Sequence, residues 1–344
     1  MADSALPAAP VPQLSPSVRD RSGVRRRLRY YGEKLGGSLI SLFAVILTSF
    51  FLFRIIPGDP VRTMTHGRPV SIEQQEQLRR DFGLDKSLAE QFWSYLTGVL
   101  RLDFGESFQF NRPVTDLIGE RIWPTVLLVG TSVVISAALG LWLGVRGAWN
   151  HGSLSDRVNT GIALTLWSVP SFWLGLILIV IFASGAGWFP TSGMESTGVS
   201  GWERIPDVAH HMVLPLTTLV AVVYAQYLMI MRSSLLDEMG SDYIVTARAK
   251  GLRDLIVRRR HAVPNALLPT VTLIFVNLGF VVFGAVLVET IFSWPGLGQL
   301  FYSGLSVPDL PLVQGLFILF SAAVVLMNLL ADLLYPVLDP RVRP

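Results

Sequence analysis

The sequence predicts an all-α integral membrane protein whose chain crosses the bilayer six times. Charged residues make up 15% of the 344 residues, apolar residues make up 51%, and the mean hydropathy is +0.49. A soluble domain carries about 25% charged residues, so this chain has too little charge to cover a water-exposed surface. Helices are expected because a backbone in lipid must satisfy its own hydrogen bonds. Six runs without Asp, Glu, Lys or Arg have about the 20 residues that a helix needs to cross a bilayer: residues 35–53, 122–145, 158–182, 208–231, 262–288 and 310–331.

Basic residues are distributed unevenly around these six runs. Seven Lys or Arg residues lie between residues 19 and 34, and seven more lie between residues 232 and 260. The connection at 293–309 has none. Lys and Arg gather in the short loops of the cytoplasmic side, so both termini and the connection at 232–260 are predicted to be cytoplasmic. The long connection at 57–121 carries basic residues too, but long loops cross the membrane largely regardless of charge.

The runs divide the chain into consecutive units. Residues 1–34 lack apolar periodicity and are predicted to form a disordered, basic cytoplasmic tail. A first transmembrane helix at 35–56 leads into a loop at 57–121, which is predicted to fold as a small extracytoplasmic domain. In that loop, Ser71 and Gln74 have the spacing of a capped helix start. The remaining units are a five-helix core at 122–337, a cytoplasmic segment within it at 233–264, and a cytoplasmic tail at 338–344.

Composition also excludes several classes of chemistry. The chain has no cysteine, which rules out disulfides and thiolate chemistry. Its five histidines show no metal-ligand spacing, so no metal site is predicted. The net charge of +3 follows from the membrane topology and does not indicate a nucleic-acid partner.

The sequence also lacks the motif of an ATP-binding phosphate loop. Such a loop needs Gly-Lys followed by Ser or Thr, and no glycine precedes any of the three lysines, Lys34, Lys86 and Lys250. The energy for any pumping must therefore come from another subunit or from a gradient.

A few residues inside the predicted spans stand out. Pro170 lies within the third run and is expected to bend that helix. Gln226 and Asn277 are polar residues within the fourth and fifth runs. Polar groups in spans generally face protein or a water-filled cavity. We therefore expect both side chains to border a translocation path, with a simple tie between two helices as the alternative.

The segment at 242–269 is basic and amphipathic, and it lies between two long apolar runs. Asp242 lies at the start of a predicted helix over 243–255, and basic residues follow toward its end, as the helix dipole favours. Ile244, Ala247 and Leu255 share one stripe of this helix with Gly251. Gly251 either ends the helix or allows another surface to approach closely.

This segment resembles the coupling loop of permease subunits of binding-protein-dependent ABC importers, and most closely that of the peptide/nickel branch. The general loop pattern is matched only by Ala247, Gly251 and Pro264. The branch pattern is matched by Asp-Tyr at 242–243, by Thr-Ala-Arg-Ala-Lys-Gly-Leu at 246–252, by Arg-His-Ala at 260–262 and by Asn-Ala-Leu-Leu-Pro at 265–269. Further matching stretches lie at 57–60, 82–85, 103–105, 170–173, 289–298 and 338–341. The likeness runs from about residue 30 to the end and is greatest to the first of the two permeases of such systems.

The resemblance implies a half-transporter of the bacterial cytoplasmic (inner) membrane, with the type I ABC importer permease fold. Its expected partners are a homologous second permease, two cytoplasmic ATPases that bind ATP and Mg, an extracytoplasmic substrate-binding protein and membrane lipid. The expected substrates are di- or oligopeptides, with nickel chelates or glutathione as alternatives. A self-contained secondary carrier is the alternative from another class, and it should show buried ionisable residues and an inverted repeat.

The resemblance also assigns site residues, and none of them is catalytic. Residues 294–299 are expected to form a stiff platform and gate under the binding protein, since a stiff loop loses less entropy on docking. These residues are Trp294, Pro295, Gly296, Leu297, Gly298 and Gln299. The helix at 243–255 is expected to insert into an ATPase, with its apolar stripe buried against that partner. The coupling residues are Asp242, Tyr243, Ile244, Ala247, Arg248, Ala249, Lys250, Gly251, Leu252 and Leu255.

Overall fold

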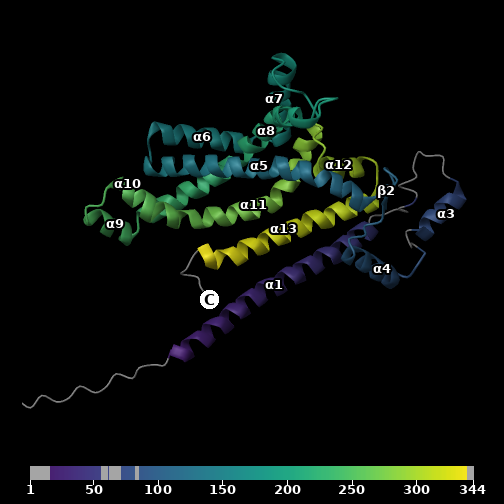
Figure 1. Ribbon diagram of the computed structural model, residues 1–344, viewed down its shortest axis with the longest axis horizontal. Helices are drawn as coiled ribbons and strands as arrows, with labels where there is room; N and C mark the ends of the chain where they lie inside the picture. Colours follow the sequence, from purple (N-terminus) through teal and green to yellow (C-terminus); the bar gives the residue numbers. More distant parts are fainter. Residues whose placement is uncertain (1–15, 56–60, 62–70, 82–84, 339–344) are drawn as a thin grey trace, which may run out of the picture.

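Long helices lying side by side along one axis form the body of the protein (Figure 1). The computed structural model describes residues 16–55, 61, 71–81 and 85–338. By length and composition, five helical stretches in this part could cross a membrane, and a bent pair of helices could supply a sixth span. The all-α membrane fold predicted from the sequence is therefore confirmed. The long helices are α1 (Pro16–Ile55), α5 (Val114–Trp149), α8 (Arg204–Met239), α11 (Val263–Ile291) and α13 (Leu310–Leu338).

Helix α1 starts well before the first apolar run. Residues 16–34 are helical, so the prediction of a disordered tail over 1–34 is wrong for them, and residues 1–15 lie outside the described part of the chain. The basic stretch has its own partners: Arg29 pairs with Glu33 one turn away, and Lys34 Nζ lies 3.1 Å from Asp332 Oδ1 on α13. The Tyr30 hydroxyl also donates to the Asp332 carbonyl at 3.0 Å. These contacts tie the stretch of α1 just before the first apolar run to the last span.

The connection between α1 and α5 forms short elements. It contains α3 (Ile72–Asp81), α4 (Leu88–Leu100) and a two-stranded antiparallel pair, β1 (Glu106–Ser107) with β2 (Arg112–Pro113). The predicted helix start is confirmed, because the Ser71 hydroxyl accepts from Gln74 N at 3.2 Å and Ser71 N donates to Gln74 Oε1 at 2.9 Å. A compact outer domain remains a prediction, since residues 56–60, 62–70 and 82–84 lie outside the described part.

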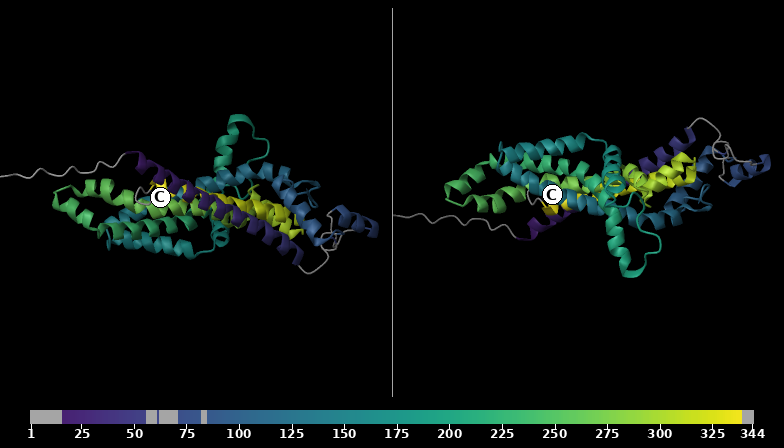
Figure 2. Two further views of the ribbon diagram at one scale, coloured as in Figure 1. Left: turned by 90° about the horizontal axis from the view of Figure 1, so that it is seen from below. Right: turned by 90° about the horizontal axis from the view of Figure 1, so that it is seen from above.

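The third predicted span is broken nearly at a right angle. Helices α6 (Leu154–Ser168) and α7 (Ser171–Leu178), the latter continued by the π-helical turn η1 (Ile179–Gly185), bend by 101° at the break. Figures 1 and 2 show α7 leaving the bundle. Pro170 lies at the break, where it cannot donate a backbone hydrogen bond, and Val169 before it is extended, as a residue before proline prefers. The predicted bend at this proline is confirmed, although it is much sharper than a kink within one helix.

Helices α5 and α8 approach each other closely at two glycines. A Cβ on Gly140 would lie 2.6 Å from Tyr227 Cβ, and a Cβ on Gly144 would lie 2.8 Å from the Leu228 carbonyl oxygen. Both distances are shorter than carbon contacts allow, so α8 can occupy this position only because α5 has no side chain there. Glycines four residues apart lie on one helix face and let membrane helices pack backbone to backbone.

An ion pair fastens α6 to α8 near one end of the bundle. Arg232 holds Asp156 with two hydrogen bonds, Nε to Oδ1 and Nη2 to Oδ2, each 2.8 Å long. Asp156 is buried and also accepts from Gly152 N at 3.0 Å. Two parallel hydrogen bonds from one guanidinium stabilise the negative carboxylate and also fix its position. The pair therefore sets the start of α6 against α8.

Breaking this pair should destabilise the protein. Asp156→Ala leaves the Arg232 guanidinium without its carboxylate, and removing one partner of a buried pair costs roughly 3–5 kcal/mol. We expect a loss of stability near the lower limit of this range, because the Arg232 side chain is 19% exposed to solvent. As a control, Glu120→Ala breaks the pair with Arg112, whose side chains are 46% and 54% exposed, so its effect should be small. Thermal unfolding midpoints in detergent compare the two variants, and equal shifts would contradict the expectation.

Candidate functional site

The segment between α8 and α11 forms a compact cap at one end of the bundle (Figure 1). It consists of α9 (Asp242–Ala249), a turn, α10 (Asp254–Ile256) and the π-helical turn η3 (Val257–Ala262). The predicted stripe of Ile244, Ala247 and Leu255 on one helix is therefore wrong, because α9 ends at Ala249 and Leu255 lies on α10. Gly251 N donates to Arg248 O at 2.9 Å, and Leu252 N donates to Ala247 O at 3.4 Å. This pair of bonds is the Schellman arrangement that ends helices.

Gly251 is required by the shape of that turn. Its φ is +78°, a left-handed conformation that residues with a side chain adopt only with strain. No atom lies within 4 Å of where its Cβ would be, so space is not what demands a glycine there. Of the two roles left open by the sequence, the structure shows the helix end, and the close approach of another surface stays a prediction.

The apolar stripe of α9 is covered by the protein itself. Ile244 and Ala247 are buried in a cluster with residues of α8, η3 and α11, among them Leu235, Val257 and Ala266. The expectation that these two side chains bury against a partner is wrong, because the cap folds back onto the helix ends that flank it. Other apolar side chains of the cap are left exposed: Val245, Leu252, Leu255 and Ile256.

Tyr243 ties the cap to both flanking spans. Its hydroxyl donates to the Glu238 carboxylate at the end of α8 and accepts from Asn265 Nδ2 on α11 at 2.9 Å. Burial raises the pKa of the Tyr243 phenol, and the hydrogen bond to Glu238 raises it further. The roles of Glu238 and Asn265 are not visible in the sequence, because they depend on three elements meeting in space. The consequence is that α9 is joined rigidly to α8 and α11.

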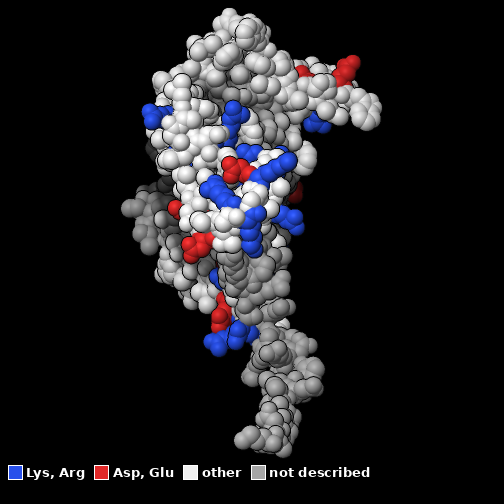
Figure 3. All heavy atoms as spheres, turned by 90° about the vertical axis from the view of Figure 1, so that its left-hand side faces the viewer, with Lys and Arg blue, Asp and Glu red and all other residues white. Residues whose placement is uncertain are grey.

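Basic side chains gather over the outside of the cap (Figure 3). The Arg248 guanidinium lies 5.7 Å from the centre of the Trp149 ring at the end of α5, and its Nε lies 3.5 Å from Asp254 Oδ1. Arg248 is therefore engaged within the chain. Lys250 and Arg253 are exposed, as are Asp242 and Ala249. The free face of the cap thus combines exposed apolar side chains with positive charge.

Gln226 and Asn277 meet each other. Asn277 Nδ2 donates to Gln226 Oε1 at 3.1 Å, which joins α11 to α8 inside the bundle. The tie between helices that the sequence left open is therefore present. Both side chains are partly buried, and their place on a translocation path stays a prediction.

The segment at 294–299, at the other end of α11, is largely buried. Trp294, Gly296, Leu297 and Gly298 are inaccessible, while Pro295 and Gln299 are partly exposed. The Trp294 indole donates to the Pro124 carbonyl on α5 at 2.9 Å. Four of the six positions pack against α5 and α11 and lead into α12 (Leu297–Ser306). The role of this segment as a platform and gate stays a prediction.

A buried carboxylate organises this segment. Glu289 Oε2 accepts from Gly298 N at 2.7 Å and from Gln299 N at 3.1 Å, and Oε1 accepts from the Thr125 hydroxyl at 2.8 Å. A Cβ on Gly296 would lie 2.3 Å from Glu289 Oε2, so only glycine fits beside the carboxylate. Glu289 therefore holds the first turn of α12 against α5 and the end of α11, which gives this stretch a structural role that the sequence analysis did not assign.

Known protein families and curated relatives match this sequence along nearly the whole chain. Residues 136–344 match the family described as "Binding-protein-dependent transport system inner membrane component", and residues 27–129 match the N-terminal region of such membrane components. The glutathione transport system permease protein GsiC of Pectobacterium atrosepticum and the dipeptide transport system permease protein DppB of Escherichia coli are each 37% identical to this chain. Both alignments cover 92% of this chain and 99% of the relative.

A solved structure supports the same fold. The inward-facing MetNI methionine ABC transporter contains a chain that aligns with a TM-score of 0.52 at 18% identity, over 65% of this chain and 96% of that one. At this identity the likeness concerns the fold alone.

Removing the Glu289 carboxylate should loosen the turn at the start of α12. Glu289→Ala leaves the Gly298 and Gln299 amides and the Thr125 hydroxyl without their acceptor, and each buried unpaired donor costs about 1–3 kcal/mol. Hydrogen exchange of peptides covering 294–300 should become at least tenfold faster. The control is Thr290→Ala, one residue on, whose hydroxyl bonds only its own helix at Val286 O. Equal exchange in the two variants would contradict the role given to Glu289.

Proposed function

The chain belongs to the family of binding-protein-dependent transport system inner membrane components, and from this premise we propose that it carries peptides across the bacterial inner membrane in an ATP-driven importer. The observation that supports this most directly is the cap formed by α9, α10 and η3. It presents an exposed surface to solvent while its inner face is packed onto two spanning helices. Such a surface can receive a push from a soluble partner and pass it to the membrane helices.

Peptides are the proposed substrate class. The two relatives described above are named for dipeptides and for glutathione, and glutathione is itself a short peptide. Both compounds are short chains with amide bonds and charged ends. In this proposal the choice among peptides is made by the extracytoplasmic binding protein, and this chain supplies half of the path.

The proposed assembly contains four kinds of chain. A homologous second permease completes the path, two cytoplasmic ATPases bind ATP and Mg, and the binding protein delivers the substrate from outside. No lysine of this chain follows a glycine, so the chain lacks the Gly-Lys step of a phosphate-binding loop. Hydrolysis therefore belongs to the ATPases, and this subunit converts their closure into helix movement without a cofactor of its own.

The coupling surface in this proposal differs from the one expected from sequence. Val245, Leu252, Leu255 and Ile256 provide its apolar part, and Lys250 and Arg253 provide its charge. Ile244, Ala247 and Tyr243 brace it from behind. A braced surface is needed because a segment free to rotate would absorb a displacement instead of passing it to α8 and α11.

The proposed orientation places the cap in the cytoplasm. The concentration of Lys and Arg between 232 and 260 supports it. Because the chain has no cysteine, single cysteines can report the side of the membrane. Both Glu73 and Arg253 are exposed. A cysteine at Glu73 should react with a membrane-impermeant maleimide added outside intact cells, and one at Arg253 should react only after the membrane is opened. The reverse pattern would overturn the orientation.

A charge placed on the apolar part of the cap should detach the ATPases. Leu255 is 51% exposed, so Leu255→Asp should leave the fold intact, but it would force a carboxylate into the proposed contact. Burying a leucine contributes about 1.5–3 kcal/mol, so the ATPases should bind at least tenfold more weakly and transport should fall in proportion. Co-purification of ATPases with the tagged permease, together with uptake of a labelled dipeptide, measures both effects.

The matched control is Ile72→Asp on α3, which lies far from the cap and is 76% exposed. It should retain the ATPases in full. Normal ATPase attachment and normal uptake in Leu255→Asp would show that the cap is not the coupling surface. Uptake that persists without any ATPase would favour the secondary carrier.

A further inference from the structure

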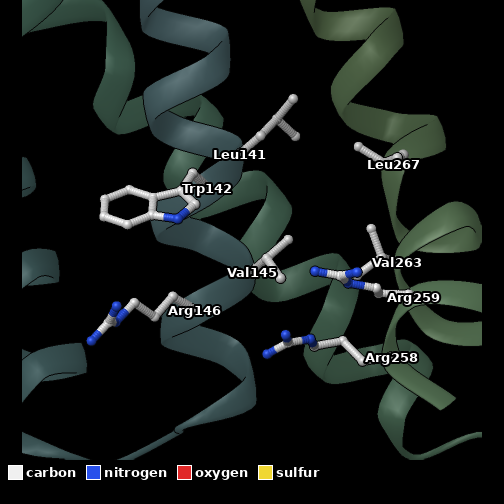
Figure 4. Close-up of a pocket in the computed structure, with 8 residues that line it drawn as sticks. All are labelled: Leu141, Trp142, Val145, Arg146, Arg258, Arg259, Val263 and Leu267. Atoms are coloured by element: carbon white, nitrogen blue, oxygen red, sulfur yellow. The ribbon is translucent and has the colours of Figure 1, made fainter. Parts of the chain in front are cut away.

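A cleft of about 430 Å³ lies between α5 and the beginning of α11, beside the cap. Figure 4 shows it from the side, with α5 on one wall and η3 with α11 on the other. Aliphatic side chains line its upper part in this view: Leu141 and Val145 from α5, and Val263 and Leu267 from α11. This part of the cleft offers an apolar ligand a surface but no hydrogen-bonding group.

Three arginines line the lower part of the same cleft. Arg258 and Arg259 extend from η3 toward α5, whereas Arg146 extends from α5 away from the η3 wall, at the outer edge of the cleft (Figure 4). Within the described part of the chain, none of the three has a carboxylate at ion-pair distance. Arg146 lies 5.9 Å from the Trp142 ring and Arg258 lies 5.7 Å from the Trp149 ring. A guanidinium that lies over an aromatic ring keeps the N–H groups at its own edge free to donate to an anion.

The two walls change from apolar to basic in the same direction. On α5, Leu141 and Arg146 are five residues apart, or about 7.5 Å of helix at 1.5 Å per residue. On the other wall the order runs from Leu267 through Val263 to Arg259 and Arg258. Both walls belong to membrane-spanning stretches near their ends. This sequence of groups, hydrocarbon first and cations within about two turns, matches the boundary of a lipid leaflet.

Trp142 marks the same boundary independently. Its side chain lies at the edge of the cleft and is exposed, although it follows a long apolar stretch of α5. Tryptophan is enriched at the level of lipid headgroups, where one part of the ring meets hydrocarbon and the N–H meets water. The cleft therefore opens where headgroups and acyl chains join.

We propose that this cleft binds one anionic phospholipid. The phosphate lies beside Arg258 and Arg259, with Arg146 at the outer edge of the cleft, and an acyl chain lies along the aliphatic wall toward Leu141 and Leu267. Arginine suits this role because its planar group offers paired N–H donors to phosphate oxygens. A lipid held in this way bridges α5 and η3, and so it braces the cap from the membrane side. An acidic surface of a partner protein is the competing occupant, but it would leave the aliphatic wall unused.

Native mass spectrometry of the intact, purified transporter tests the proposal. The delipidated complex is titrated with phosphatidylglycerol or with phosphatidylcholine carrying the same acyl chains. Each basic residue near an anionic lipid contributes about a factor of five in binding. The double variant Arg258→Gln and Arg259→Gln should therefore bind phosphatidylglycerol about 25-fold more weakly and phosphatidylcholine as before. Val145→Trp should also weaken phosphatidylglycerol binding, since the ring fills the cleft while every arginine remains.

Two controls keep the result specific. Arg157→Gln removes an exposed arginine outside the cleft and should bind like the unmodified protein. The double variant Arg258→Lys and Arg259→Lys keeps the charge and should bind better than the glutamine pair, which separates lost charge from lost folding.

Four outcomes would overturn the proposal. They are equal affinity for the two lipids, the same loss in Arg157→Gln as in the double glutamine variant, displacement of the lipid by millimolar inorganic phosphate, and binding by the isolated chain but not by the assembled complex. The third result would indicate a free-anion site, and the fourth would indicate that a partner subunit occupies the cleft. None of these results bears on whether the cap couples to ATPases.

Discussion

The backbone-to-backbone contact of α5 with α8 is the constraint on which the rest of the structure depends. Gly140 and Gly144 leave so little room that a methyl group at either position would meet α8 at less than 3 Å. In lipid, helices gain nothing from hiding apolar surface, so close packing of small residues is what holds them. Once α8 is fixed against α5, the Asp156–Arg232 pair places α6, and the Asn277–Gln226 bond places α11. The elements with functional surfaces are attached to this core.

In the proposed assembly, the cap serves two contacts, one with its own chain and one with an ATPase. Its inner stripe is occupied by the chain itself, and Tyr243 joins it to the helices before and after it. Its outer side keeps exposed leucine, isoleucine and valine beside positive charge. Force applied to that outer side reaches α8 and α11 through packed atoms and hydrogen bonds, since the stripe and the Tyr243 bonds leave the cap little freedom to turn by itself. The positive φ at Gly251 keeps the turn between α9 and α10 tight.

Buried polar groups fasten the two ends of the bundle in a similar way. At one end Asp156 accepts from a guanidinium and from a backbone amide, and at the other Glu289 accepts from two amides and a hydroxyl. A carboxylate without such donors would be costly to bury, and donors without an acceptor would be costly as well. Each group therefore specifies one arrangement of the helix ends around it. Between these two ends, the close packing of α5 on α8 is joined by the Asn277–Gln226 hydrogen bond described above.

The sequence by itself determined the all-α membrane class, the approximate spans, the bend at Pro170, the capped start of α3 and the segment that forms the cap. These features follow from local quantities: hydropathy over about 20 residues, the missing N–H of proline and the spacing of a capping pair. Tertiary structure alone decided that Ile244 and Ala247 face inward, that Trp294 is buried against α5 and Gly298 against Glu289, and that residues 16–34 continue α1. An apolar stripe or a stiff loop has the same sequence pattern whether it packs against its own chain or against a partner protein. Which surface it packs against depends on contacts between residues far apart in the chain, as between Tyr30 and Asp332.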